Sequence, residues 1–213
     1  MARTYSSELR ARRAQQNRER VLAVATEMFC SRGWVSTTVA DVATDAGVTR
    51  QTVYQQFPNK LALLDACIDH ALSAGEGIPV RELAEYRAMG NGSPEERLAA
   101  GARWLCAAHI RSAAIQNVLD EAAVTDPAAA QRLGVREANR WDEVQWALTV
   151  ITGARPTDAI VDAVWLLAAR RNWLRLIDER GWTPGEWTDW FIGHAGVDVS
   201  GGGSPAPGVS STQ

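Results

Sequence analysis

Apolar residues recur at helical spacing along most of this chain, and no stretch shows the two-residue alternation of a β-strand. From Arg18 to Arg32 the apolar positions repeat at intervals of three and four residues, and Gly33 ends the pattern. The same spacing covers Lys60 to about Ser73. Further helices are predicted over 94–108, 128–152, 156–180 and the residues after Thr183. The pattern therefore predicts an all-α fold.

Helix-start signals support several of these assignments. Ser93-Pro94-Glu95-Glu96 supplies a cap, a proline at the first helical position and two acids at the positive helix end. Thr183-Pro184-Gly185-Glu186 has the form of a capping box and begins the last helix, and Pro156 opens the helix before it. Gly134 is a candidate break within 128–152, because glycine is a poor helix former.

Two short helices with a tight corner between them are predicted from Thr38 to Phe57. Thr38-Val39-Ala40-Asp41 has the Thr-x-x-acid form of a capping box, Gly47 suits the left-handed end of a helix, and Thr49 can cap the next helix. Along that second helix Val53 and Phe57 share a core-facing side. The opposite side is polar and carries Arg50, Gln51, Tyr54 and Gln55. This arrangement is typical of a helix-turn-helix.

The segment from Gly33 to Leu64 resembles the DNA-binding signature of TetR-type (tetracycline-repressor-like) transcriptional regulators. Many members of that family carry a small residue at the position of Gln51 and histidine at that of Gln56. The residues that carry the resemblance are Gly33-Trp34, Thr37-Thr38, Asp41-Val42-Ala43, Ala46-Gly47-Val48, Tyr54, Phe57 and Lys60. The resemblance implies a DNA-binding head, a helical body with a small-molecule pocket, and a dimer formed by the last two long helices.

The polar side of the second helix is the candidate base-reading surface. Arg50 and Gln51 lie at its start, and arginine can pair with guanine and glutamine with adenine in the major groove. Gln55 can read a base or a backbone oxygen, and Thr38, Tyr54 and Lys60 are assigned to phosphates. The alternative is an ordinary polar helix surface. The predicted DNA-binding residues are Thr38, Thr49, Arg50, Gln51, Tyr54, Gln55 and Lys60. Trp34 is expected to fill the core of the head.

Charge is distributed unevenly along the chain. Residues 1–60 hold nine Lys/Arg and five Asp/Glu, which gives +4, and the remainder holds thirteen and twenty, which gives −7. The basic part thus contains the motif, as expected for a partner of double-stranded DNA. Residues 1–17 include Arg3, Arg10, Arg12 and Arg13 with little apolar content. They are predicted to form a flexible arm, which either follows the DNA backbone or minor groove or is a solvated tail.

Cysteine usage and the lack of long apolar runs bear on the compartment. Cys30, Cys67 and Cys106 are an odd number and lie in helical patterns, which argues against a disulfide framework and favours a reducing cytoplasm. No apolar stretch resembles a signal sequence or reaches the length of a membrane span. A cytoplasmic protein with no membrane partner and no cofactor is expected.

A homodimer is predicted because a single helix-turn-helix reads few base pairs, and such modules usually bind two half-sites of a palindromic operator. The stretch from Ile160 to Ala169 is apolar around nearly its whole circumference, and Trp187, Trp190, Phe191 and His194 offer a second apolar face. Packing within one chain is the alternative explanation for both.

Nine tryptophans are many for 213 residues, and several lie in the predicted body. We expect a pocket there for an unknown effector, hydrophobic and either aromatic or cationic, whose binding releases DNA from a repressor. Each tryptophan can equally be core filling. The candidate ligand-binding residues are Trp104, His109, Trp141, Trp165 and Asn172.

Other functional classes are weaker. Cys67 with His70 and Cys106 with His109 share one spacing, so the four could hold a metal in a metal- or redox-sensing regulator, although buried cysteines and surface histidines are commoner. No catalytic motif is present, and the chain is not expected to be an enzyme. A sequence-indifferent architectural DNA-binding protein is a further alternative.

The glycine-containing segment 75–92 shows little periodicity beyond Leu83 to Tyr86 and is the predicted domain boundary. Beyond Gly196 the composition cannot bury enough apolar area to offset ordering entropy. The predicted division is a basic arm (1–17), a helix-turn-helix domain with its linking helix (18–74), a helical ligand-binding and dimerisation domain (75–196) and a disordered tail (197–213).

Overall fold

The structure is a computed structural model that describes residues 2–200, with side chains described from Arg12 to Ala195. The chain forms two compact units. The first comprises residues up to Leu83 together with 107–137, and the second comprises 84–106 and the residues from Ala138 on. No strand occurs within residues 2–200, so the predicted all-α fold is confirmed for the described chain.

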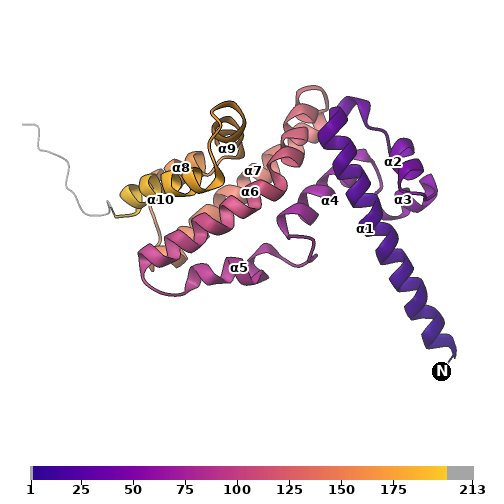
Figure 1. The fold of residues 1–213 in the computed structure, drawn as a ribbon, viewed down its shortest axis with the longest axis horizontal. Helices are drawn as coiled ribbons and strands as arrows, with labels where there is room; N and C mark the ends of the chain where they lie inside the picture. The colour runs from indigo at the N-terminus through magenta and orange to yellow at the C-terminus, as the bar shows by residue number, and fades with distance from the viewer. Residues whose placement is uncertain (1, 201–213) are drawn as a thin grey trace, which may run out of the picture. The chain divides into compact units, whose positions relative to one another are not determined.

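Four helices form the N-terminal part of the first unit (Figure 1). They are α1 (Ala2–Ser36), α2 (Val39–Asp45), α3 (Arg50–Gln56) and α4 (Lys60–Leu72). Helix α1 packs against both α2 and α4, and α2 packs against α3. The helical run of α1 is interrupted at Gly33, whose φ of 75° lies in the left-handed region that favours glycine.

The core of the first unit extends beyond these four helices. Phe29, Val42, Val53 and Leu63 are fully buried in it. Later parts of the chain complete the same core with Ile115, Val118, Leu119, Ala122 and Ala129. Trp34 is 9% exposed and also belongs to this core, as the sequence predicts. The centroid of its ring lies 6.0 Å from that of Phe29.

Two long helices contribute residues to both units. They are α6 (Pro94–Thr125) and α7 (Pro127–Thr152). Before them come the short helix α5 (Ala84–Arg87) and two 3-10 turns, η1 (Val80–Glu82) and η2 (Ala88–Gly90). After them, in the second unit, come α8 (Asp158–Leu167), α9 (Arg170–Leu174), a π-helical turn η3 (Arg175–Glu179) and α10 (Pro184–Ser200), with α8 packed against α10.

Aromatic side chains fill much of the second unit. Tyr86 lies edge-on to Trp104 at 4.6 Å and stacks on Trp146 at 5.6 Å between ring centroids. Trp187, fully buried, contacts Trp173 edge-on at 5.0 Å and stacks with Phe191 at 5.2 Å. The tryptophans of the body therefore act at least partly as core.

The structure corrects the N-terminal prediction, because α1 begins at Ala2 and runs through the region expected to be a flexible arm. Residues 2–17 contain no glycine or proline and are rich in alanine, arginine and glutamine, which are good helix formers. Because they precede a stable helix, extending it requires no new helix nucleus. The C-terminal boundary is also corrected, since α10 continues to Ser200, and the tail predicted at 201–213 lies outside the described residues.

Three internal boundaries differ from the prediction. Helix α6 continues without interruption past Ala108 to Thr125, and α7 passes through Gly134 without a break. The single helix expected over 156–180 is divided at Ala168 and Ala169. There the Arg140 Nη1 donates to the Trp165 carbonyl at 2.8 Å, and the Asn172 amide donates to the carbonyl of Leu166. Side chains thus donate hydrogen bonds to two carbonyls of the last turn of α8, and Leu166 O also accepts from the Ala169 amide at 3.2 Å.

Candidate nucleic-acid interface

The corner between α2 and α3 is built by a short run of specific backbone contacts. Gly47 has a φ of 65°, the Gly47 amide donates to Thr44 O at 3.1 Å, and the Val48 amide donates to Ala43 O at 2.9 Å. These bonds satisfy carbonyls at the end of α2 and reverse the chain within a few residues. The local sequence therefore fixes the angle at which α3 leaves α2, as the helix-turn-helix prediction requires.

Threonine hydroxyls start both helices. The Thr38 Oγ1 accepts from the Asp41 amide at 3.1 Å, and the Thr49 Oγ1 accepts from the Thr52 amide at 3.1 Å. Thr38 also donates to the Asp41 carboxylate at 2.7 Å. Both threonines are exposed. Their positions at helix N-termini agree with the predicted caps.

Helix α3 separates a buried side from an exposed one. Val53 is fully buried and Phe57 is 3% exposed, which holds the helix in the core of the first unit. On the outer side Tyr54 is 51% exposed. The other three predicted contacts on α3, Arg50, Gln51 and Gln55, are exposed as well. The structure thus brings the four α3 residues together on one accessible helix face.

Lys60 is placed differently from these residues. Its ammonium donates to the carbonyl of Trp34 and lies 4.2 Å from the centroid of the Trp34 ring. Burial lowers the pKa of Lys60, and the charge of the Asp126 carboxylate opposes that shift. The only lysine of the sequence is therefore already bound within the first unit, where it joins the start of α4 to the end of α1.

An arginine that the sequence analysis did not single out supports α3 from the other side. The guanidinium of Arg18, on α1, lies 4.7 Å from the centroid of the Phe57 ring. A cation over an aromatic face is attracted by the ring quadrupole, so this contact helps to hold the end of α3 against α1. The two residues are far apart in sequence, so no local sequence pattern predicts their contact.

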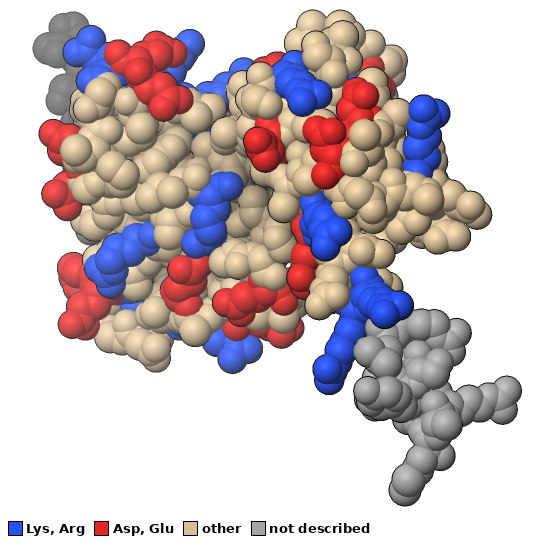
Figure 2. Space-filling model, turned by 45° about the vertical axis from the view of Figure 1, so that its right-hand side comes forward, with Lys and Arg blue, Asp and Glu red and all other residues tan. Residues whose placement is uncertain are grey.

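Figure 2 shows one face of the molecule, on which Lys/Arg and Asp/Glu side chains are interspersed rather than gathered by sign.

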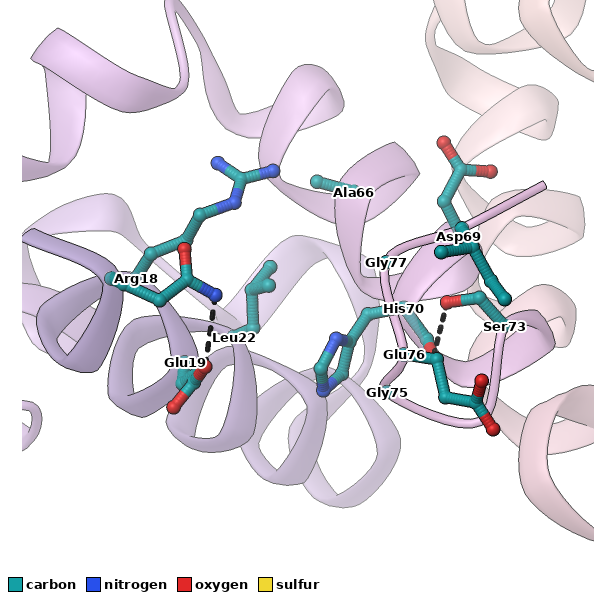
Figure 3. A pocket seen from close by; sticks show the side chains of 12 residues that line it. Arg18, Glu19, Leu22, Ala66, Asp69, His70, Ser73, Gly75, Glu76 and Gly77 are labelled. Atoms are coloured by element: carbon teal, nitrogen blue, oxygen red, sulfur yellow. Dashed lines mark hydrogen bonds between the residues drawn. The ribbon is translucent and has the colours of Figure 1, made fainter. Parts of the chain in front are cut away.

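A cleft of about 280 Å³ lies elsewhere in the first unit. Figure 3 shows Arg18 and Leu22 of α1 on one side and Ala66 and His70 of α4 on the other. Glu19 accepts from Gln15 Nε2 at 2.8 Å and Asp69 accepts from Arg136 Nη2 at 2.7 Å, so both acids are engaged by protein groups. The full lining is Gln15, Arg18, Glu19, Leu22, Ala66, Asp69, His70, Ser73, Gly75, Glu76, Gly77 and Ile78.

The candidate metal site is not formed. Among the described residues, no group of three or more His, Cys, Asp or Glu side chains could hold a metal ion. Cys67 is fully buried with its Sγ 3.7 Å from the Leu22 carbonyl, and burial raises its pKa to about 12. Cys106 Sγ lies 3.6 Å from the carbonyl of Pro184. Both thiols thus pack as core groups, and neither joins His70 and His109 in a metal site.

The five candidate effector residues are divided between the two units. His109 is buried in the first unit, whereas the other four belong to the second. The Trp141 Nε1 donates to Asp162 Oδ1 at 2.8 Å, and the Asn172 amide donates to Leu166 O, so both polar groups are already paired. Within the described chain, the buried indole nitrogens of Trp104 and Trp165 have no hydrogen-bond partner.

None of the described helices combines the length and apolar character needed to cross a membrane.

Comparison with protein families identifies the N-terminal segment. The model described as "Bacterial regulatory proteins, tetR family" matches residues 21–67, which contain α2, α3 and part of α1 and α4. The chain is similar to the HTH-type transcriptional regulator TtgR of Pseudomonas putida, with 43% identity over 56 residues, 26% of this chain and 27% of TtgR. The HTH-type transcriptional regulator SrpR of Pseudomonas putida is 38% identical over 58 residues, 27% of each chain. The matched segment thus spans about a quarter of these relatives.

Solved structures resemble the chain over most of its length. A Rhodococcus sp. protein assigned to the TetR family of transcriptional regulators matches with a TM-score of 0.66 and 18% identity, covering 87% of this chain and 100% of that one. A TetR-family transcriptional regulator from Streptomyces coelicolor matches with a TM-score of 0.57 and 20% identity, covering 87% and 95%. At these identities the likeness establishes the fold, a helix-turn-helix head followed by a helical C-terminal part. The relatives are named as regulators, in line with the expectation that the chain is not an enzyme.

Proposed function

Since its N-terminal domain belongs to the TetR family of bacterial regulatory proteins, we propose that this protein is a DNA-binding transcriptional regulator. The observation that supports this most directly is the exposed side of α3, where Arg50, Gln51, Tyr54 and Gln55 lie together while Val53 and Phe57 fix the opposite side in the core. A helix held in this way can enter a major groove with its polar side chains toward base edges.

The division of roles follows from what each side chain is free to do. Arg50 and Gln51 read bases, because both are exposed at the first turn of α3, and Gln55 reads a base or a backbone oxygen one turn later. Tyr54 and the capping hydroxyls of Thr38 and Thr49 contact phosphates, and the Thr38 hydroxyl gives up its hydrogen bond to Asp41 Oδ2 to do so. Lys60 contributes chiefly by positioning, since its ammonium is bonded to Trp34 O.

The regulator acts as a homodimer on a palindromic operator in the cytoplasm. One module of this size buries too little surface to select a site alone, and two-fold dimers solve this by reading two half-sites. Helices α8 and α10 supply the dimer surface in this proposal, and Leu166 of α8 is 57% exposed although it is a large apolar residue.

A small effector binds the second unit and releases the operator, so that the protein is a repressor. The unpaired indole nitrogens of Trp104 and Trp165 and the unpaired amide nitrogen of Gln145 support this proposal. Buried donors without partners cost free energy, and a hydrophobic or aromatic ligand that carries an oxygen acceptor would satisfy them. The effector releases DNA only if it prefers a conformation that binds the operator poorly.

Selection of bound sequences from random DNA, followed by anisotropy titrations, tests the proposal. We expect a palindromic site whose affinity exceeds that for random DNA by roughly a thousandfold or more. Arg50→Ala and Gln51→Ala should each lower it by roughly tenfold and relax one operator position. Arg103→Ala, an exposed arginine of α6, is the control and should leave binding unchanged. Similar affinity for chosen and random DNA would indicate an architectural protein instead.

A further inference from the structure

Three arginines of α7 lie four residues apart, at 132, 136 and 140. Side chains at this spacing fall on one side of a helix, one turn above another. We name Arg132, Arg136 and Arg140 the arginine ladder. Each of the three bonds to a helix other than α7. Arg132 and Arg136 bond to α4, and Arg140 bonds to α8.

The first two members of the ladder hold α4. Arg136 Nε donates to Asp65 Oδ1 at 2.6 Å, and its Nη2 donates to Asp65 O at 3.0 Å and to Asp69 Oδ1 at 2.7 Å. Arg132 pairs with the other carboxylate oxygen of Asp65. The arginines at two successive turns of α7 therefore bind acids at two successive turns of α4.

These ion pairs are better shielded from water than ordinary surface pairs. The side chains of Arg136 and Asp65 are 16% and 19% exposed. Burial raises the pKa of Asp65, but the hydrogen bonds and charges of Arg132 and Arg136 lower it by more, so the net shift is downward. A partly buried carboxylate with both oxygens bonded to guanidinium groups forms a specific link between α7 and α4.

The third member of the ladder holds α8. Arg140 Nη1 donates to the carbonyl of Trp165 at 2.8 Å, and its guanidinium lies 4.5 Å from the centroid of the Trp165 ring. The adjacent Trp141 Nε1 donates to Asp162 Oδ1 at 2.8 Å. Two neighbouring residues of α7 thus fix the last two turns of α8.

Helix α7 is continuous from Pro127 to Thr152, and its residues belong to the first unit up to Glu137 and to the second from Ala138. A continuous helix transmits displacement along its axis because its backbone bonds keep successive turns together. At the other end, α4 follows α3 after only three residues, 57–59, so a change in α4 alters where the base-reading side chains lie.

We propose that the arginine ladder of α7 couples the position of α8 to the position of α4 and thereby sets DNA affinity. This inference rests on the proposed function, because it concerns how that DNA-binding site is regulated. It assigns Arg136 and Arg140 as positioning residues that touch neither DNA nor effector. An effector or dimer contact that displaces α8 would act on the operator through these side chains.

A double-mutant cycle tests the coupling without knowledge of the effector. Operator dissociation constants are measured for the wild type, Arg136→Gln, Arg140→Gln and the double variant. If the ladder couples α8 to α4, Arg140→Gln changes affinity in the wild type by roughly threefold or more and has little effect once Arg136 is replaced, so the two changes are non-additive by that same factor of roughly three or more. Arg97→Gln is the matched control, since Arg97 Nη1 donates to Val150 O at 3.1 Å in the second unit and lies outside the ladder; paired with Arg136→Gln it should be additive.

Hydrogen exchange of the DNA-free protein separates failure of this inference from failure of the proposed function. We expect Arg140→Gln to speed exchange of the α4 amides in the wild type but not in the Arg136→Gln background. Arg136→Lys keeps the positive charge but loses the planar, two-pronged geometry of the guanidinium, so it should give an intermediate coupling. It replaces Arg136→Gln in the test if the glutamine variant folds poorly. The proposed coupling would be overturned if Arg136→Gln and Arg140→Gln had additive effects on DNA affinity and Arg140→Gln left the exchange of the α4 amides unchanged. Absence of any preferred DNA sequence would overturn the proposed function, whatever the exchange shows.

Discussion

The ammonium of Lys60 lies 4.2 Å from the centroid of the Trp34 ring and donates a hydrogen bond to the carbonyl oxygen of the same residue. Trp34 lies near the end of α1 and Lys60 is the first residue of α4. The pair therefore closes the segment that contains α2 and α3, and it joins the two ends of the helix-turn-helix by one charged contact. A base-reading helix needs such a fixed frame.

Replacing Lys60 by methionine should destabilise the first unit. The change leaves the Trp34 carbonyl without its charged donor and removes the cation over the ring, so we expect the free energy of unfolding to fall by about 2 kcal/mol. Urea titration followed by tryptophan fluorescence measures it. Lys60→Arg keeps the charge and should lose less. Equal stabilities of wild type and Lys60→Met would show that the contact contributes nothing.

Asp65 gives the protein a predictable response to acid. Burial raises the pKa of this carboxyl, but Arg132 and Arg136 lower it by more, so its pKa in the folded state lies below the ordinary value of 3.8. A carboxyl with a lowered folded-state pKa stabilises the fold fully above its unfolded-state pKa, and this contribution is lost as pH falls through the folded-state pKa. Asp65→Asn should therefore cost about 2–3 kcal/mol at neutral pH.

The difference between wild type and Asp65→Asn should then shrink as the solution is acidified below pH 3.8. Urea titrations at neutral pH and in acid give the two differences. Asp189→Asn, which changes an exposed residue of α10, should cost little at either pH. A difference between wild type and Asp65→Asn that stays constant down to the most acidic condition would contradict the role assigned to the arginine pairs.

The helix-turn-helix was predictable because its determinants are local. The cap at Thr49, the left-handed glycine at Gly47 and the alternation of Val53 with exposed polar residues are all read within a few positions of one another. The ion pair of Asp65 with Arg136 was not predictable in this way. Its members are 71 residues apart, and either charge alone looks like an ordinary solvated side chain.

The same distinction explains the errors in the second unit. Periodicity over 156–180 predicts one helix, and the break at Ala168 and Ala169 depends on Arg140 from another helix and on Asn172 reaching back to a carbonyl. Asn172, which the sequence analysis predicts as a polar anchor for an effector, donates its amide to the carbonyl of Leu166 in the structure. Partners of this kind are set by tertiary packing, which propensity and spacing do not contain.

Ala74 offers a stabilising substitution. Its φ of 52° makes it the one non-glycine residue with positive φ among the described residues. The amides of Ala74 and Gly75 bond back to Ala71 O and His70 O at 3.2 and 2.8 Å, the pattern that ends a helix and usually has glycine at this position. Ala74→Gly should raise the free energy of unfolding by about 0.5–1 kcal/mol. Ala114→Gly, at an exposed position inside α6, should lower it by about 1 kcal/mol; the same sign for both would contradict the argument.

Thr49 allows its two assigned roles to be separated. Thr49→Ala removes the hydroxyl that accepts from the Thr52 amide, so we expect a loss of about 1 kcal/mol in stability and weaker operator binding as α3 frays. Thr49→Asp retains a capping oxygen and should restore stability, but its charge would repel a nearby phosphate. Operator binding of the folded Thr49→Asp protein should therefore fall more than that of Thr49→Ala. Equal binding by Thr49→Asp and wild type would remove Thr49 from the DNA surface.

Two arginines in the N-terminal part of α1 test whether the basic arm contacts DNA. Arg12 and Arg13 are exposed and lie in a continuous helix, not in the flexible segment that the composition predicts. If they contact phosphates, Arg12→Gln with Arg13→Gln should weaken binding to all DNA sequences alike and reduce the slope of log affinity against log salt by about 0.9 per lost contact. Glutamine keeps the helix, so the change tests charge and not folding. Gel-shift titrations over a range of salt concentrations provide the slope, and an unchanged slope would mean that this end of α1 only supports the head.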